Sequence, residues 1–169
     1  IYGQTWAKVR RRSVDNVIEE AQWLKVEHGA EFFYFADDTF IIHPAWIEEF
    51  STRYRKRVGV PFVCNVRANL VTDDLIRLLR EAGCHSACMG VETADDEIRN
   101  LLFKRRMSKE QMIEAAGVLH RYGIKLYTAN ILGVPNGSLD IDLALDHRGL
   151  TEAGYRTIQQ LLLARGYAQ

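Results

Sequence analysis

Polar side chains follow four apolar stretches of the chain, each at the point where the stretch ends. The polar residues are Asp37, Asp38 and Thr39 after the first stretch, Arg67 after the second, Glu92 and Thr93 after the third, and Asn130 in the fourth; Ala36, Leu132 and Gly133 stand beside them and complete the candidate ligand-binding residues. A guanidinium forks to a carboxylate, and carboxylates accept hydrogen bonds from an ammonium group or from hydroxyls. These residue types predict a site for a small zwitterionic ligand that carries hydroxyl groups.

Helical and strand-like patterns alternate along most of the chain. Strands are expected at 32–35, 58–66, 84–91 and 124–132, and helices after Ser13, from Pro44, after Thr72, near 95–103 and over 108–122. Alternation of this kind favours the α/β class, with a parallel sheet, helices outside it and right-handed crossovers. The strands fit either an open doubly wound sheet or part of a (β/α) barrel. In both, ligands bind where the strands end, so the polar residues would meet at one rim.

The alternation of helix and strand breaks down after Pro135. Residues 139–145 fit a short helix, and Thr151 is expected to cap a last amphipathic helix. We therefore divide the chain into a basic lead-in at 1–12, a βα core at 13–138 and a divergent helical tail at 139–169. The chain opens on Ile1 without an initiator Met, which we interpret as a piece of a longer or trimmed protein.

The composition is that of an ordinary globular protein. Its 169 residues carry 22 Lys and Arg against 22 Asp and Glu, a balance that gives no attraction to nucleic acid. No apolar run reaches the roughly 18 residues that a membrane helix needs. Cys64, Cys84 and Cys88 lack the spacing of a disulfide framework, which favours a reducing, cytoplasmic compartment.

Five stretches in combination carry a family resemblance. They are RRSVDNVIEE, FFYFADDTFII, PFVCNVRANLVTDDLIRLLREAGC, MGVET and MSKEQMIEAAGVLHRYGIKLYTANILGVP. The segment that they cover, from Arg11 to Pro135, resembles the radical S-adenosylmethionine (SAM) superfamily, and in particular its cobalamin-binding branch. The resemblance implies a full or partial (β/α) barrel of the TIM type, and for this segment a partial one that is open at its edges.

The resemblance also implies cofactors and roles. Members of the superfamily hold a [4Fe–4S] cluster with a Cys-x-x-x-Cys-x-x-Cys loop and bind SAM at its fourth iron. One electron cleaves SAM to methionine and a deoxyadenosyl radical, or methyl groups are transferred through cobalamin. Carried over by position, 36–39 would contact the SAM amino group, Arg67, Glu92 and Thr93 would hold its carboxylate and ribose, and 130–134 would pack near the adenine.

The chain departs from the family pattern in its cofactor motifs. Cys84-x-x-x-Cys88 copies half of the cluster motif, but Val91 stands where a third cysteine is required. Even spacing along a strand is expected to place the two thiols on one face, as small buried groups. Asp146 and His147 are adjacent and do not form the Asp-x-His-x-x-Gly cobalamin signature. We therefore expect no metal ligands and no catalytic residues, but a SAM-binding core that holds neither cluster nor cobalamin and is inactive alone.

Two other hypotheses stay open at this point. Asp37 and Asp38 could bind Mg²⁺ in a non-catalytic module of the receiver type, although the third aspartate and the lysine of that type are missing from the other strand ends. The chain could also be a degenerate α/β module in which these acids are structural only. Because an open partial barrel exposes sheet edges, a homodimer is predicted as well.

Overall fold

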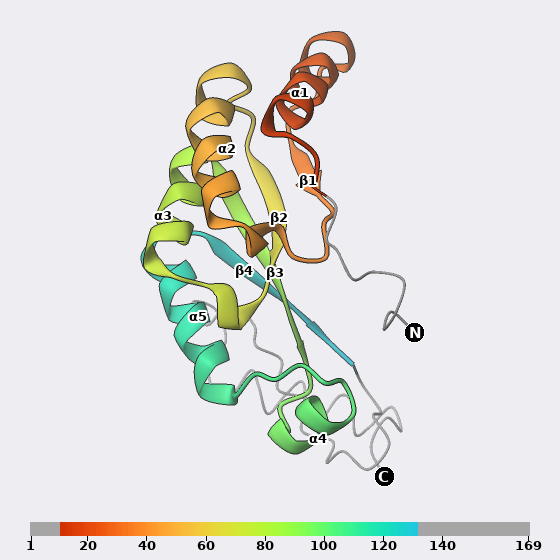
Figure 1. The fold of residues 1–169 in the computed structure, drawn as a ribbon, viewed down its shortest axis with the longest axis vertical. Coiled ribbons are helices and arrows are strands. Elements are labelled where there is room, and N and C mark those ends of the chain that lie inside the picture. The colour runs from red at the N-terminus through yellow and green to blue at the C-terminus, as the bar shows by residue number, and fades with distance from the viewer. Residues whose placement is uncertain (1–10, 132–169) are drawn as a thin grey trace, which may run out of the picture.

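Four strands form one parallel sheet at the centre of the molecule (Figure 1). The structure is a computed structural model and describes residues 11–131, so the helices predicted in the tail lie outside the described residues. The strands are β1 (Phe33–Phe35), β2 (Phe62–Val66), β3 (Cys84–Glu92) and β4 (Lys125–Asn130), in the order β1-β2-β3-β4. Every neighbouring pair is parallel, which confirms the α/β class.

The helix boundaries follow from local sequence. The helices are α1 (Val14–His28), α2 (Pro44–Arg57), α3 (Asp73–Ala82), α4 (Asp96–Leu101) and α5 (Lys109–Arg121), with two short 3₁₀ turns, η1 (Phe40–Ile42) and η2 (Ala68–Leu70). Ser13, Thr72 and Ser108 each accept a hydrogen bond from a backbone N–H of the first helical turn. Gly29 ends α1 in the left-handed conformation, with φ of 63°. None of the helices within 11–131 is long and apolar enough to cross a membrane.

The consecutive strand order decides between the two candidate architectures. Because a right-handed crossover between neighbouring parallel strands puts its helix on the same side each time, α2, α3 and α5 stack along one face of the sheet (Figure 1). A doubly wound sheet or a receiver module needs a point where the strand order reverses. The four described strands have no such point, so the receiver interpretation of Asp37 and Asp38 is wrong. The sheet is an open portion of a (β/α) barrel.

Aromatic side chains fill the layer between α2 and the first two strands. Phe50 and Tyr54 of α2 and Phe62 of β2 are fully buried. Phe35 of β1 packs edge-on against Phe62, with ring centroids 5.2 Å apart. Tyr54 Oη donates a hydrogen bond to the carbonyl oxygen of Val60 at 2.8 Å, so the only hydroxyl among these four rings is satisfied.

An irregularity in β3 changes the face to which its side chains point. Phe62 pairs with Cys84, but the next residue of β2 pairs with Ser86, so His85 is an extra residue in the ladder. Cys84 is therefore buried toward the helices, whereas Cys88, between two buried residues, lies on the opposite face. The expectation that these two cysteines share a face is wrong, because it assumed an unbroken alternation.

We predict that Tyr54→Phe lowers the free energy of unfolding by about 1–2 kcal/mol, because the buried Val60 carbonyl loses its donor. Burial raises the pKa of Tyr54, so the unfolded chain releases this proton first. The stabilisation by Tyr54 is complete below the unfolded pKa of about 10 and is lost as the pH rises above it.

Urea unfolding from neutral to alkaline pH measures both effects. The variant should lose less stability than the wild type above pH ~10. Tyr127→Phe, at an exposed position on β4, is the matched control and should change neither quantity. Equal stability of Tyr54→Phe and the control would contradict the prediction.

Candidate functional site

The loop after β1 presents its backbone and carboxylates at the carboxyl end of the sheet. Asp37 and Asp38 are both exposed, and Thr39 is half-buried. The carbonyl oxygen of Asp37 accepts a hydrogen bond from Asn65 Nδ2 at 2.7 Å, and that of Asp38 accepts one from the Thr39 hydroxyl at 2.8 Å. The loop is thus ordered through its carbonyl groups, while its two carboxylates stay available to solvent.

A cavity of about 420 Å³ adjoins this loop, between α1 and β1. Ala36, Asp37 and Thr39 contribute to its lining, together with the rings of Phe35 and Trp46. The loop after β1 therefore borders a cavity that it shares with α1.

Glu92 ends β3 in a strained backbone conformation. Its φ is 65°, a left-handed value that costs a residue with a side chain on the order of 1–2 kcal/mol. Gly90 pairs with Ala129 and Glu92 pairs with Asn130, so the residue between them is extra and the backbone turns there. The backbone N–H of Ile131 donates to the Glu92 carbonyl at 2.8 Å and holds the turned strand end in place. Strain kept by surrounding contacts is typical of functional positions.

Arg67, Arg105 and Glu92 form a chain of polar contacts at the end of β3. Arg105 forms an ion pair with Glu92, whose side chain is only 13% exposed. Arg67 donates from Nη2 to the carbonyl oxygen of Arg105, and its buried Nε has no hydrogen-bond partner among the described residues. Burial, and then the nearby Arg67 charge, lower the pKa of Arg105. The cluster carries one more positive charge than negative, so it favours an added carboxylate.

Gly90 leaves the space that the Glu92–Arg105 pair occupies. A Cβ atom at this position would lie 2.8 Å from Glu92 Oε1 and 3.0 Å from Arg105 Nη2. Both contacts are to the ends of flexible side chains, so a larger residue would displace the ion pair and leave the backbone in place. The absence of a side chain at Gly90 therefore makes room for the ion pair.

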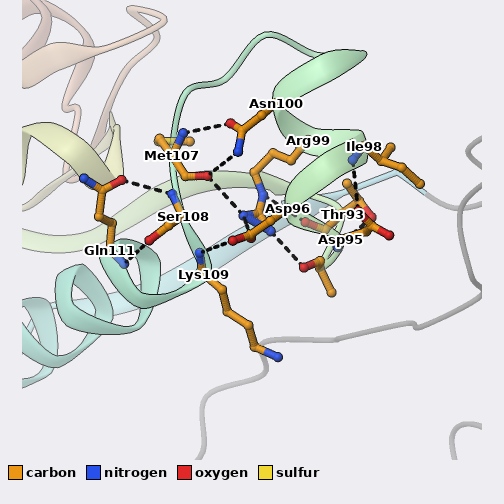
Figure 2. Close-up of polar contacts among 11 residues, drawn as sticks. Thr93, Asp95, Asp96, Ile98, Arg99, Asn100, Met107, Ser108, Lys109 and Gln111 are labelled. Atoms are coloured by element: carbon orange, nitrogen blue, oxygen red, sulfur yellow. Dashed lines mark hydrogen bonds and ion pairs between the residues drawn. The ribbon is translucent and has the colours of Figure 1, made fainter.

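A buried arginine of α4 holds together the segments before and after that helix (Figure 2). The Arg99 side chain has no exposed surface and donates to the carbonyl oxygens of Thr93 at 3.0 Å, Ala94 at 2.9 Å and Met107 at 3.3 Å. Its charge is paired with Asp96 Oδ1 at 2.5 Å. Arg99 therefore ties the segment after Glu92 to the segment that follows Arg105.

Not every predicted site residue has its side chain in this cluster. Thr93 Oγ1 accepts from the backbone N–H of Asp95 at 3.3 Å and so helps to start α4. Asn130 lies beside Glu92 in the sheet, but its side chain donates to Thr128 Oγ1 at 3.1 Å, on the face that β4 turns toward the helices. Leu132 and Gly133 lie outside the described residues.

The three cysteines do not converge on a common point. Cys64 and Cys84 are fully buried on the helix side of the sheet, and Cys88 lies on the other side. A hydrogen bond to Cys84, and then burial, raise the pKa of Cys64, and burial raises that of Cys88. Raised thiol pKa values oppose metal ligation, which needs thiolates. Within 11–131, no three His, Cys, Asp or Glu residues are grouped so that they could hold a metal ion.

The profile of the Radical SAM superfamily matches residues 2–145. The chain belongs to the radical SAM superfamily. It is 27% identical to an uncharacterized methyltransferase of Pyrococcus horikoshii over 136 aligned residues, and these make up 80% of this chain and 29% of that relative. It is 25% identical over 130 residues to the cytidylyl-2-hydroxyethylphosphonate methyltransferase of Streptomyces wedmorensis, covering 76% of this chain and 24% of that relative. This radical SAM chain thus spans less than a third of the length of either relative.

Solved structures share the fold of this radical SAM chain. The cobalamin-dependent SAM radical enzyme OxsB, with aqua-cobalamin bound, matches with a TM-score of 0.63 and 20% identity over 73% of this chain and 20% of the other. The radical SAM methyltransferase TsrM from Kitasatospora setae, with tryptophan substrate and a SAM analogue bound, matches with a TM-score of 0.64 and 15% identity, over 91% of this chain and 28% of TsrM. Both matches support the partial barrel.

Sequence reasoning missed Arg105 and Arg99. Arg105 stands in the run Lys104-Arg105-Arg106, which has the composition of a solvated loop, and it reaches Glu92 because both of its neighbours have φ of 52°. Arg99 lies in a helix of only six residues, where the spacing of polar and apolar residues carries little information. The i,i+3 spacing of Asp96 and Arg99 is the one signal that pointed to their ion pair.

We predict that Arg99→Met lowers the free energy of unfolding by about 2–4 kcal/mol, because three backbone carbonyls lose a donor and Asp96 loses its partner. Amide hydrogen exchange over residues 93–107 should accelerate in this variant. Arg77→Met removes an exposed arginine that pairs with Glu81 on α3 and is the control, with an expected loss of under about 0.5 kcal/mol. Equal losses in the two variants would contradict the supporting role of Arg99.

Proposed function

We propose that this chain is the SAM-binding core of a radical SAM enzyme of the cobalamin-dependent class. The observation that carries the proposal is the cluster of Arg67, Arg105 and Glu92 at the carboxyl ends of parallel strands. Membership of the superfamily and the relatives named as methyltransferases support it. The division into a lead-in, a core at 13–138 and a tail belongs to the same proposal, as do a cytoplasmic location and a homodimer through the open sheet edges.

The residues at the rim fit the polar groups of SAM. Its carboxylate suits the guanidiniums of Arg67 and Arg105, and its ribose hydroxyls suit the Glu92 carboxylate and Thr93. Its ammonium group suits the loop at 36–39, where two exposed carboxylates raise the local negative potential. Bound at a reduced cluster, SAM supplies a deoxyadenosyl radical. The part of this chain is to bind SAM and to orient it.

The [4Fe–4S] cluster does not fit the residues of this chain. A cluster of this kind needs several cysteine thiolates close together. The three cysteines here lie on two faces of the sheet; Cys64 and Cys84 are buried, and the pKa of the Cys64 thiol is raised. We therefore propose that the chain alone does not cleave SAM. Cobalamin, bound in the OxsB and TsrM structures, would likewise be held by parts of a full-length enzyme that residues 11–131 do not include.

Isothermal titration of the chain with SAM tests the proposal, and Glu92→Gln is the informative variant. It keeps the size of the side chain and removes the charge that binds Arg105 and accepts from ribose, so we expect affinity for SAM to fall about tenfold. Glu81→Gln makes the same chemical change in an exposed ion pair on α3 and should bind as the wild type does. If the wild-type chain does not bind SAM, the proposal is wrong.

We further predict that Gly90→Ala weakens SAM binding severalfold, because the added methyl group displaces Glu92 and Arg105. Its free energy of unfolding should stay within about 0.5 kcal/mol of the wild type, since the methyl group contacts only mobile side-chain ends. Gly117→Ala in α5, where a Cβ atom meets nothing within 4 Å, is the matched control. The control should gain stability by up to about 1 kcal/mol and bind SAM normally.

A further inference from the structure

Asn65 is placed to act on the loop after β1. The last registered pair between β1 and β2 joins Phe35 to Cys64, so Asn65 stands one step further, beside the start of the loop. Strand alternation puts its side chain on the face away from the helices, which Tyr34 shares. Asn65 is thus the first residue of β2 that the loop meets as it leaves the sheet.

The Asn65 side-chain amide donates one hydrogen bond and accepts another. Nδ2 donates to the carbonyl oxygen of Asp37 at 2.7 Å, and Oδ1 accepts from the Tyr34 hydroxyl at 3.2 Å. A carbonyl oxygen can only accept, so the amide can face it with nitrogen alone, and the tyrosine hydroxyl then meets the oxygen. The Asp37 carbonyl therefore fixes the orientation of the amide, and the Tyr34 hydroxyl, which donates to Oδ1, helps to hold the amide in that orientation.

We propose that Asn65 is a positioning residue for the amino-acid end of SAM: by holding the Asp37 carbonyl, it fixes the loop at 36–39 that receives the ammonium group. This inference rests on the proposed function. Asp37 O and Asp38 O are both engaged by side chains of the protein, and this sets the direction in which the Asp37 and Asp38 carboxylates leave the backbone. The nucleoside end of SAM has no part in this contact, so the effect of Asn65 is confined to one end of the ligand.

Asn65→Asp separates this role from a general structural one. The two side chains have the same shape, but the carboxylate cannot donate and would place one acceptor against another at the Asp37 carbonyl. We expect affinity for SAM to fall about tenfold. Affinity for methylthioadenosine, which has the nucleoside but no amino-acid part, should change by less than about twofold. Tyr34→Phe removes only the orienting bond and should weaken SAM binding about threefold, again without an effect on methylthioadenosine.

Titration calorimetry of the full chain with both ligands decides the matter, with thermal unfolding to establish that each variant is folded. Asn69→Asp, an exposed position near the same rim, controls for the added negative charge and should bind both ligands normally. If wild-type protein binds SAM and Asn65→Asp binds it equally well, or loses both ligands in equal measure, the inference is overturned and the proposed function stands. If the wild type binds neither ligand, the proposed function is wrong and the inference falls with it. If Asn65→Asp does not fold, the SAM-selective loss in Tyr34→Phe supports the inference, and its absence overturns it.

Discussion

The parallel pairing of four strands in chain order is the constraint on which the rest of the structure depends. Each pairing places one more carboxyl end at the same edge of the sheet, and each crossover returns the chain on the same side. Residues separated by dozens of positions, such as Asn65 and Glu92, thereby become parts of one rim. The helices bury one face with an aromatic and aliphatic core, which leaves the other face and the rim to take up polar contacts.

The charges at the rim are held at two depths. Arg99 is fully buried and binds carbonyl groups on both sides of α4, so it acts as part of the framework. Arg105 and Glu92 are partly exposed and pair with each other, and the buried Arg67 Nε has no hydrogen-bond partner among the described residues. The contacts of Arg99 hold the neighbouring backbone in place, and this helps to maintain the unsatisfied donor of Arg67 and the strained backbone of Glu92.

Much of this arrangement could be predicted from the sequence, and the failures have physical causes. Helix ends were predictable because Ser13, Thr72 and Gly29 act through contacts within a few residues. The rim was predictable because apolar stretches end at polar residues. The two extra residues of β3 could not be predicted, because a bulge depends on how the strand pairs with its neighbour. For this reason the sequence placed Cys88 on the wrong face of the sheet. The role of Arg105 could not be predicted either, because its partner Glu92 lies 13 positions away and Arg105 reaches it only through the left-handed backbone of a loop.

Because of its two irregularities, β3 should respond differently to substitutions and to deletions. With nine residues it is the longest strand of the sheet, yet its alternation of inward and outward side chains restarts at His85 and again near Val91. Exchanging one side chain for another alters a single contact, whereas losing a regularly paired residue such as Ala87 would shift the register and turn Met89 away from the helices. Related sequences should therefore differ in this strand by substitutions more often than by insertions or deletions. Protein engineers who wish to alter the rim should keep the number of residues between Cys84 and Glu92 unchanged.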